Sequence, residues 1–107
     1  MMLLNETLPY LVLALESALA HLGRGNVANQ LREVTIERWT YDETSDVIYL
    51  HLRSPRAAGA AGSPGETVSL YDELGVNLDT DGQGSLTGIE VLAGHTIIAQ
   101  LEKFPAD

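Results

Sequence analysis

The sequence predicts an α+β fold: an antiparallel sheet of about five strands in hairpins, packed against an N-terminal amphipathic helix, with a short C-terminal helix. Residues 39–52 and 75–92 each place β-branched or aromatic residues on both sides of a turn rich in Asp, Gly and Ser, which is typical of a β-hairpin. Apolar residues recur at helical spacing near both ends of the chain. A chain of 107 residues suits a single domain with one core.

The first expected element is a helix that Asn5 or Thr7 can cap and that ends at Gly23. Leu13 lies off its main apolar stripe, so the helix either has a wide core face or also touches a second subunit. Residues 26–33 are compatible with a short second helix that begins at Asn26. The apolar stripe itself consists of Leu8, Leu11, Val12, Leu15, Ala18, Leu19 and Leu22.

Five strands are expected, at residues 34–41, 47–53, 67–71, 75–79 and 86–92, and helical spacing returns over residues 96–104. Residues 54–66 contain no large apolar side chain and are rich in Pro, Gly and Ala, so we expect a flexible loop inside the domain. Alternation along the strands predicts a core face formed by Ile48, Leu50, Leu52, Val68, Leu70, Val76, Leu78, Ile89 and Val91.

Composition and charge favour some classes of partner over others. The formal charge is -9, from 15 acidic and 6 scattered basic residues, which disfavours binding to nucleic acid or to an anionic membrane and permits a basic protein partner. Cysteine is absent, so disulfides and thiol chemistry are excluded. No basic residue precedes the apolar run over residues 8–15, which is also shorter than the ~20 residues that span a bilayer. We therefore expect a cytoplasmic protein.

The segment from Asp79 to Glu90 resembles a twelve-residue calcium loop, with Asp79, Asp81 and Glu90 at ligand positions. That loop needs a helix on each side, whereas both flanks here are strand-like. In a hairpin, Glu90 would lie too far along its strand to reach the turn. We expect an Asp/Gly hairpin turn and no metal site.

A surface for binding or dimerisation is expected on the first hairpin. If its turn closes symmetrically about Thr44, a cluster of polar-tipped aromatic residues shares one face of the sheet with Glu37. Cross-strand pairing without any binding role is the alternative interpretation. The expected surface consists of Trp39, Tyr41, Tyr49 and His51.

The sequence contains no recognisable catalytic constellation. Ser, His and Asp are all present, but no nucleophile elbow or phosphate loop accompanies them, and no cofactor site is expected. Paired acids occur only at predicted turns, where carboxylates usually form the turn and face solvent. The pairs are Asp42 with Glu43, Asp72 with Glu73, and Asp79 with Asp81.

The two hairpins together resemble a family of small prokaryotic proteins, domain-of-unknown-function family 2283. Its first motif matches Tyr41, Asp42, Asp46, Tyr49, Leu50 and Leu52, and its second matches Gly75, Val76, Leu78, Asp79 and Asp81, followed by Gly88, Ile89, Glu90, Val91 and Leu92. The resemblance covers about residues 39–92. The helical first 33 residues and the Pro/Gly/Ala segment between the motifs depart from the family pattern. The resemblance implies a small α+β domain and no established activity, substrate or cofactor.

These observations favour a small non-enzymatic binding or assembly module that forms a homodimer. A chain this short buries only a little over ~60% of its unfolded surface alone, so self-association is a plausible way to hide the rest. Two alternatives are an antitoxin-like or regulatory protein that neutralises a basic partner, and a metal-dependent enzyme that uses the acidic turns. The dimer contact is expected either on the aromatic sheet face or, through Leu13, on the first helix.

Overall fold

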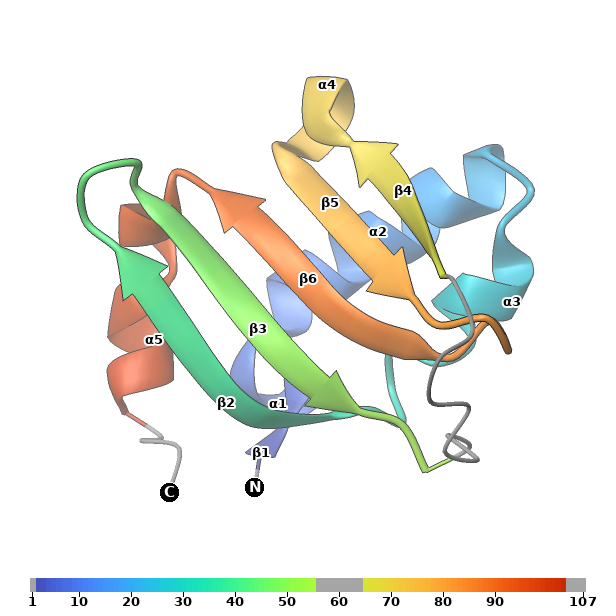
Figure 1. Ribbon diagram of the computed structural model, residues 1–107, viewed down its shortest axis with the longest axis horizontal. Coiled ribbons are helices and arrows are strands. Elements are labelled where there is room, and N and C mark those ends of the chain that lie inside the picture. Colours follow the sequence, from blue (N-terminus) through green and yellow to red (C-terminus); the bar gives the residue numbers. More distant parts are fainter. Residues whose placement is uncertain (1, 56–64, 104–107) are drawn as a thin grey trace.

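The computed structural model describes residues 2–55 and 65–103, and it confirms the predicted α+β class. One antiparallel sheet has the strand order β1-β2-β3-β6-β5-β4 (Figure 1). All five predicted strands are present. The sixth, β1, is a two-residue strand paired with β2 and is too short to carry a periodic signal. The strands are β1 Met2–Leu3, β2 Thr35–Asp42, β3 Val47–Arg53, β4 Glu66–Leu70, β5 Val76–Thr80 and β6 Leu86–Leu92.

The helices leave one face of the sheet open. The layer of α2, α3 and α5 lies behind the sheet in Figure 1. The short helix α4 forms the connection between β4 and β5. The predicted N-terminal and C-terminal helices are therefore both confirmed, the latter shortened to five residues. The helices are α1 Leu4–Thr7, α2 Pro9–His21, α3 Gly25–Ala28, α4 Tyr71–Leu74 and α5 Ile98–Glu102, and η1, Gly94–Thr96, is a 3₁₀ turn before α5.

Neither Asn5 nor Thr7 caps the predicted first helix, because both lie inside the short helix α1 and α2 begins only after Leu8. The backbone of Leu8 has φ -130° and ψ 62°, because a residue that precedes proline is sterically disfavoured from helical geometry. Pro9 then occupies the first turn of α2, where its missing N–H costs no hydrogen bond. At the other end, Gly23 takes φ +71° and the N–H of Arg24 bonds back to the carbonyl of Leu19 at 2.8 Å, which ends the helix.

The core is a single cluster between the sheet and the helix layer, and every residue of the predicted core face is buried in it. Leu8 and, from α2, Val12, Leu15 and Leu19 belong to the same cluster. The expectation for Leu22 is wrong, because this residue lies past the last helical turn and its side chain is 52% exposed. The face of α2 that points away from the sheet is thus not part of the core.

The predicted symmetric turn about Thr44 is also wrong. The strands pair Asp42 with Val47, so the loop is one residue out of the expected register, and a slip of one residue moves every side chain to the other face. The Asp42 carboxylate accepts the N–H of Thr44 at 3.0 Å, which stabilises the observed turn. A bulge between Ile36 and Arg38 restores the register farther along, so that Ile36 still faces the core.

The predicted loop over residues 54–66 lies mostly outside the described residues, but its ends are placed. Ser54 is buried and Glu66 begins β4. A side chain at Gly65 would collide with the carbonyl oxygen of Thr80, so the chain enters β4 in close contact with β5. Across the part of the chain that is described, no helix is both long enough and apolar enough to cross a membrane.

Candidate functional site

The open face of the sheet is organised around Tyr49 on β3. Its hydroxyl donates to Asp79 on β5 at 2.6 Å, although β6 lies between the two strands. This reach is possible because Gly88 on β6 has no side chain beneath the ring: a Cβ at that position would stand 2.0 Å from the hydroxyl oxygen. Thr67 on the edge strand β4 donates to the other oxygen of Asp79 at 2.7 Å. One carboxylate therefore links strands β3, β5 and β4.

Polar pairs extend this network along the same face. Asn77 donates to Glu90 at 3.0 Å, directly beside the Tyr49–Asp79 bond in the sheet. His51 lies against Tyr49 with ring centroids 4.7 Å apart. Burial and then the hydrogen bond to Asp79 raise the pKa of Tyr49 well above its usual value, whereas burial and then Arg38 lower the pKa of His51. Burial thus favours the neutral form of both rings.

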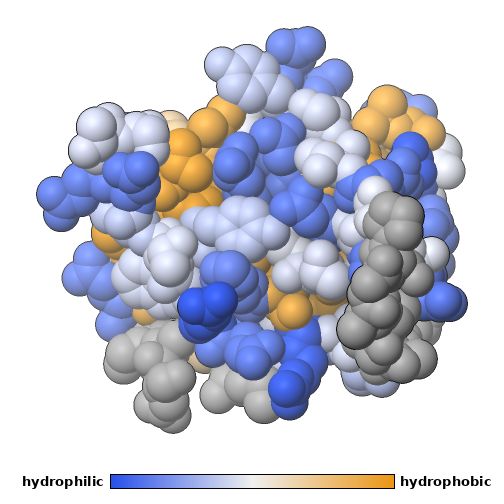
Figure 2. All heavy atoms as spheres, in the orientation of Figure 1, coloured by the Kyte–Doolittle hydropathy of each residue, from blue (hydrophilic) through white to orange (hydrophobic). Residues whose placement is uncertain are grey.

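The structure divides the expected aromatic surface between two faces. Tyr49 and His51 lie on the open face, while Trp39 and Tyr41 pair with Leu50 and Ile48 and so point toward the helices. There they are partly buried and pack against the core. The open face is mainly hydrophilic or intermediate in hydropathy, with smaller hydrophobic areas (Figure 2). The predicted aromatic patch therefore does not exist as one surface.

Asp46 connects the first hairpin to the end of β6. It has φ +55°, and its carboxylate accepts the hydroxyl of Tyr41 and the backbone N–H of His95, both at 2.8 Å. The ring Nδ1 of His95 also contacts this carboxylate, and the N–H of Gly94 bonds to the Asp46 carbonyl. The hydrogen bonds from His95 and then from Tyr41 lower the pKa of Asp46. The carboxylate at Asp46 thus joins the β2–β3 turn to η1.

We expect Asp46→Asn to lose stability in a pH-dependent way. Asparagine tolerates the left-handed backbone, so the change mainly removes the charge. Because the folded pKa lies below the ordinary 3.8, the extra stability of the wild type is full above that value and disappears as pH falls through the folded pKa. Urea unfolding of both proteins at pH 7 and at acid pH should show the difference shrinking. A difference that is equal at both pH values would contradict this assignment.

The predicted hairpin over residues 79–90 is confirmed, with β5 and β6 on either side of the turn. Asp81 accepts the N–H groups of Gln83 and Ser85, both at 2.9 Å, so it caps the turn. Asp79 faces Tyr49 and Thr67, and Glu90 bonds Asn77. Within residues 2–55 and 65–103, no three His, Asp or Glu side chains are grouped to hold a metal ion.

A buried glutamine links the helix layer to this hairpin through hydrogen bonds. Gln30 is 6% exposed, and its amide nitrogen donates to the carbonyls of Asn26 at 3.0 Å and Gly84 at 2.8 Å. Its amide oxygen accepts the N–H of Leu86 at 2.8 Å. Two of these bonds satisfy backbone groups at the entry to β6, and the third reaches the carbonyl of Asn26 in α3. Gln30 therefore positions the hairpin that carries Asp79 and Gly88.

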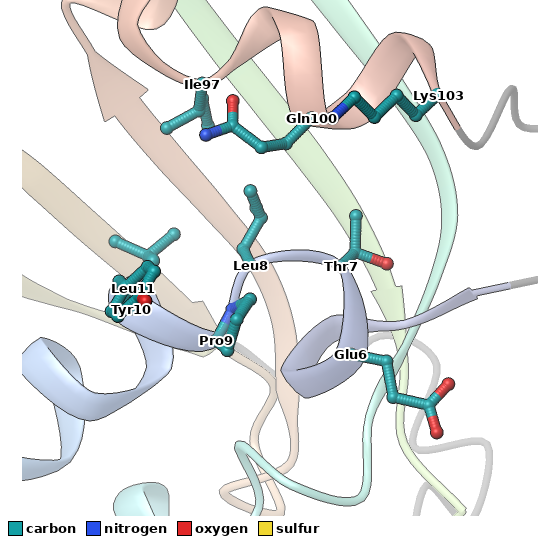
Figure 3. Close-up of a pocket in the computed structure, with 9 residues that line it drawn as sticks. All are labelled: Glu6, Thr7, Leu8, Pro9, Tyr10, Leu11, Ile97, Gln100 and Lys103. Carbon is teal, nitrogen blue, oxygen red and sulfur yellow. The ribbon is translucent and has the colours of Figure 1, made fainter.

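The outer face of α2 carries large exposed apolar side chains. Tyr10 is 85% exposed and Leu13 is 54% exposed, and both lie opposite the buried stripe of the helix. A groove of ≈ 350 Å³ separates the start of α2 from α5, where Leu8 and Leu11 face Ile97 and Gln100 (Figure 3). A second groove, of ≈ 390 Å³, lies at the other end of α2 and is lined by Ala14, Ser17, Ala18, His21, Leu22, Leu70, Glu73 and Leu74.

Sequence reasoning missed three of these features. Gln30 and His95 act over 56 and 49 residues of sequence separation, which no local pattern reveals. Tyr10, however, carries a readable signal: it lies three residues before Leu13 and seven before Ser17, on the side of the helix opposite Leu15. A helical projection of α2 would have placed Tyr10 and Leu13 together on its outward side.

A family model described as "Protein of unknown function (DUF2283)" matches residues 38–93. The match begins within β2, runs past the end of β6 and contains Tyr49, Asp79, Gly88 and Glu90. No curated protein sequence and no solved structure is significantly similar to the chain. The family match thus covers the sheet strands from β2 onward, and α2 with its outer face lies before it.

Proposed function

The chain belongs to the DUF2283 family, and from that premise we propose that it is a non-enzymatic assembly module of the cytoplasm, which forms a homodimer through the outer face of α2. The observation that carries this proposal is a pair of large exposed apolar side chains on that face, Tyr10 at 85% and Leu13 at 54% exposed. Large exposed apolar side chains that gather on one face are typical of interaction sites, whereas scattered ones are not.

Three hydrogen-bonded residues inside the family match favour a structural role over catalysis. Tyr49, Asp79 and Glu90 are hydrogen-bonded within the sheet face, to one another or to Thr67 and Asn77. A catalytic carboxylate or hydroxyl must be available to a substrate, and a metal-ligating carboxylate needs free oxygen lone pairs. In this family member these bonded side chains therefore stabilise the sheet against which the helix layer packs. The metal-dependent enzyme that the acidic turns suggested is the less favoured reading.

The charge distribution favours a second copy over other partners. Two molecules of charge -9 repel each other except where uncharged surfaces meet. Along α2 the only carboxylate belongs to Glu16, and Arg32 binds it through two hydrogen bonds of 2.9 and 3.0 Å. Apart from this paired Glu16, α2 thus carries no acidic side chain in an otherwise acidic protein. A basic partner, the regulatory alternative, would be drawn to the acidic surfaces instead.

We expect light scattering to give a mass near twice 11.5 kDa at micromolar concentration, and Leu13→Glu to shift the protein to monomer. The new carboxylate would be buried without a partner, and changes at the centre of an interface commonly cost ~2 kcal/mol or more of binding free energy, which is about thirtyfold in Kd. A monomeric wild type would refute the proposal.

The matched control is Thr40→Glu, which adds the same charge to an exposed position of the open sheet face. It should leave the dimer intact; if it dissociates the dimer and Leu13→Glu does not, the sheet face is the interface. Trp39→Glu is unsuitable because Trp39 packs against the core, so unfolding would mimic dissociation. Recovery of a stoichiometric complex with a basic protein instead of a homodimer would support the regulatory alternative.

A further inference from the structure

The second groove, between α2 and the β4–α4 corner, has the size and lining of an aromatic side-chain pocket. Leu22, Leu70 and Leu74 supply apolar walls. His21 and Glu73 contribute polar groups to the same lining. Its volume of ≈ 390 Å³ exceeds that of one aromatic side chain. A ring that carries a polar tip would match this combination of walls and polar groups.

The same molecule carries such a ring. Tyr10 is the most exposed of the large apolar side chains, at 85%, and it stands on the first turn of α2. It is one of the residues that line the first groove, at the α2 side of that groove (Figure 3). No hydrogen bond of its hydroxyl is among those of the described residues. An aromatic side chain this exposed gains the most from burial in a partner.

Ring and groove are placed symmetrically about the middle of α2. Tyr10 and His21 lie on the same outward side of the helix, about 16 Å apart along its axis at ~1.5 Å per residue. A two-fold axis through the middle of a helix brings its first turn against the last turn of the partner's helix, so each residue contact occurs twice. Small side chains at Ala14 and Ser17 lie near that midpoint and permit close approach of the two helices.

We infer that, in the homodimer proposed above, Tyr10 of each copy inserts into the α2–α4 groove of the other. The ring packs between Leu22 and Leu74, and the hydroxyl donates to the Glu73 carboxylate. The occupant is a second copy because Tyr10 and the receiving groove lie at opposite ends of one helix, and an antiparallel pair of α2 helices brings the two together. The exposed Leu13 then lies inside the contact, close to the two-fold axis.

Disulfide cross-linking tests this arrangement. The chain contains no cysteine, so no native thiol can form a competing disulfide. Tyr10→Cys combined with Leu74→Cys should give a covalent dimer under mild oxidation, since Cα atoms within about 7 Å can be bridged. Within one chain Tyr10 stands on the first turn of α2, whereas Leu74 belongs to α4 and lines the groove at the other end of α2, so the bond must form between chains. Tyr10→Cys combined with Thr40→Cys on the open sheet face is the matched control and should stay uncross-linked.

Two outcomes separate this inference from the dimer itself. If the protein is a dimer that Leu13→Glu dissociates, but the Tyr10/Leu74 pair does not cross-link and Tyr10→Ala leaves Kd unchanged, the insertion of Tyr10 is refuted and the dimer stands. If the wild type is monomeric, both are refuted. The expected result is efficient cross-linking together with a rise in Kd of about thirtyfold for Tyr10→Ala, as for a residue that dominates an interface.

Discussion

Gln30→Met should lower the free energy of unfolding by about 3 kcal/mol, although it preserves the length of the side chain. Methionine fills much the same volume but makes none of the three hydrogen bonds to Asn26, Gly84 and Leu86. The N–H of Leu86 is then buried without a partner, and each orphaned buried group costs roughly 1–3 kcal/mol. In a chain of this size the melting temperature should fall by roughly 15 °C.

Urea denaturation at one fixed protein concentration measures this effect, because dimerisation makes stability depend on concentration. The matched control is Gln83→Met, the same change at an exposed position of the β5–β6 turn, which should alter stability by less than about 0.5 kcal/mol. Equal effects of the two substitutions would mean that the amide of Gln30 contributes no more than a surface side chain. The link between α3 and the hairpin would then be dispensable.

Gly88→Ala should destabilise the protein by about 2 kcal/mol, and only when Tyr49 is present. A methyl group at this position would stand 2.0 Å from the Tyr49 hydroxyl oxygen and 2.5 Å from the ring carbon that bears it. The ring must swing off the sheet, which breaks its bond to Asp79 and exposes its apolar surface. In an unobstructed strand, by contrast, alanine is more stable than glycine by roughly 0.5–1 kcal/mol.

A double-mutant cycle separates the two effects. In a Tyr49→Ala background, the further change Gly88→Ala should be neutral or stabilising, so the coupling free energy between the two positions should be about 2–3 kcal/mol. Tyr49→Phe provides the control for the hydroxyl, because it keeps the ring over Gly88 and removes only the bond to Asp79. Equal costs of Gly88→Ala in both backgrounds would show that the ring does not occupy the space above β6.

Local patterns predicted most of the sheet, and long-range contacts explain what they missed. Alternation alone identified Ile48, Leu50 and Leu78 as core residues, because strand side chains alternate strictly. The face of Trp39 could not be predicted, since it depends on a bulge and on the turn that Asp42 closes. Both features shift the register by one residue while leaving the hydrophobic pattern almost unchanged.

The candidate site was predicted only in part. The sequence identifies Tyr49 and His51 as surface residues, but Asp79, the partner of Tyr49, is 30 residues away and reads locally as a turn former. The outer face of α2 was noted through Leu13, whereas Leu22 was assigned to the core because it continues the periodic stripe beyond the point where the helix ends. Periodicity indicates which residues share a face, but not where a helix stops or what lies against it.

The strand order has a consequence for how this chain can vary in length. β3 and β4 are consecutive in the sequence, yet β6 and β5 lie between them in the sheet, three strand spacings or roughly 14 Å. An extended chain crosses that distance with about four or five residues, whereas residues 54–65 join the two strands here. Both ends of the crossing are anchored, by buried Ser54 and by the close contact of Gly65 with β5. This connection is therefore the natural place to shorten the chain or to insert a reporter peptide, because neither hairpin would have to move.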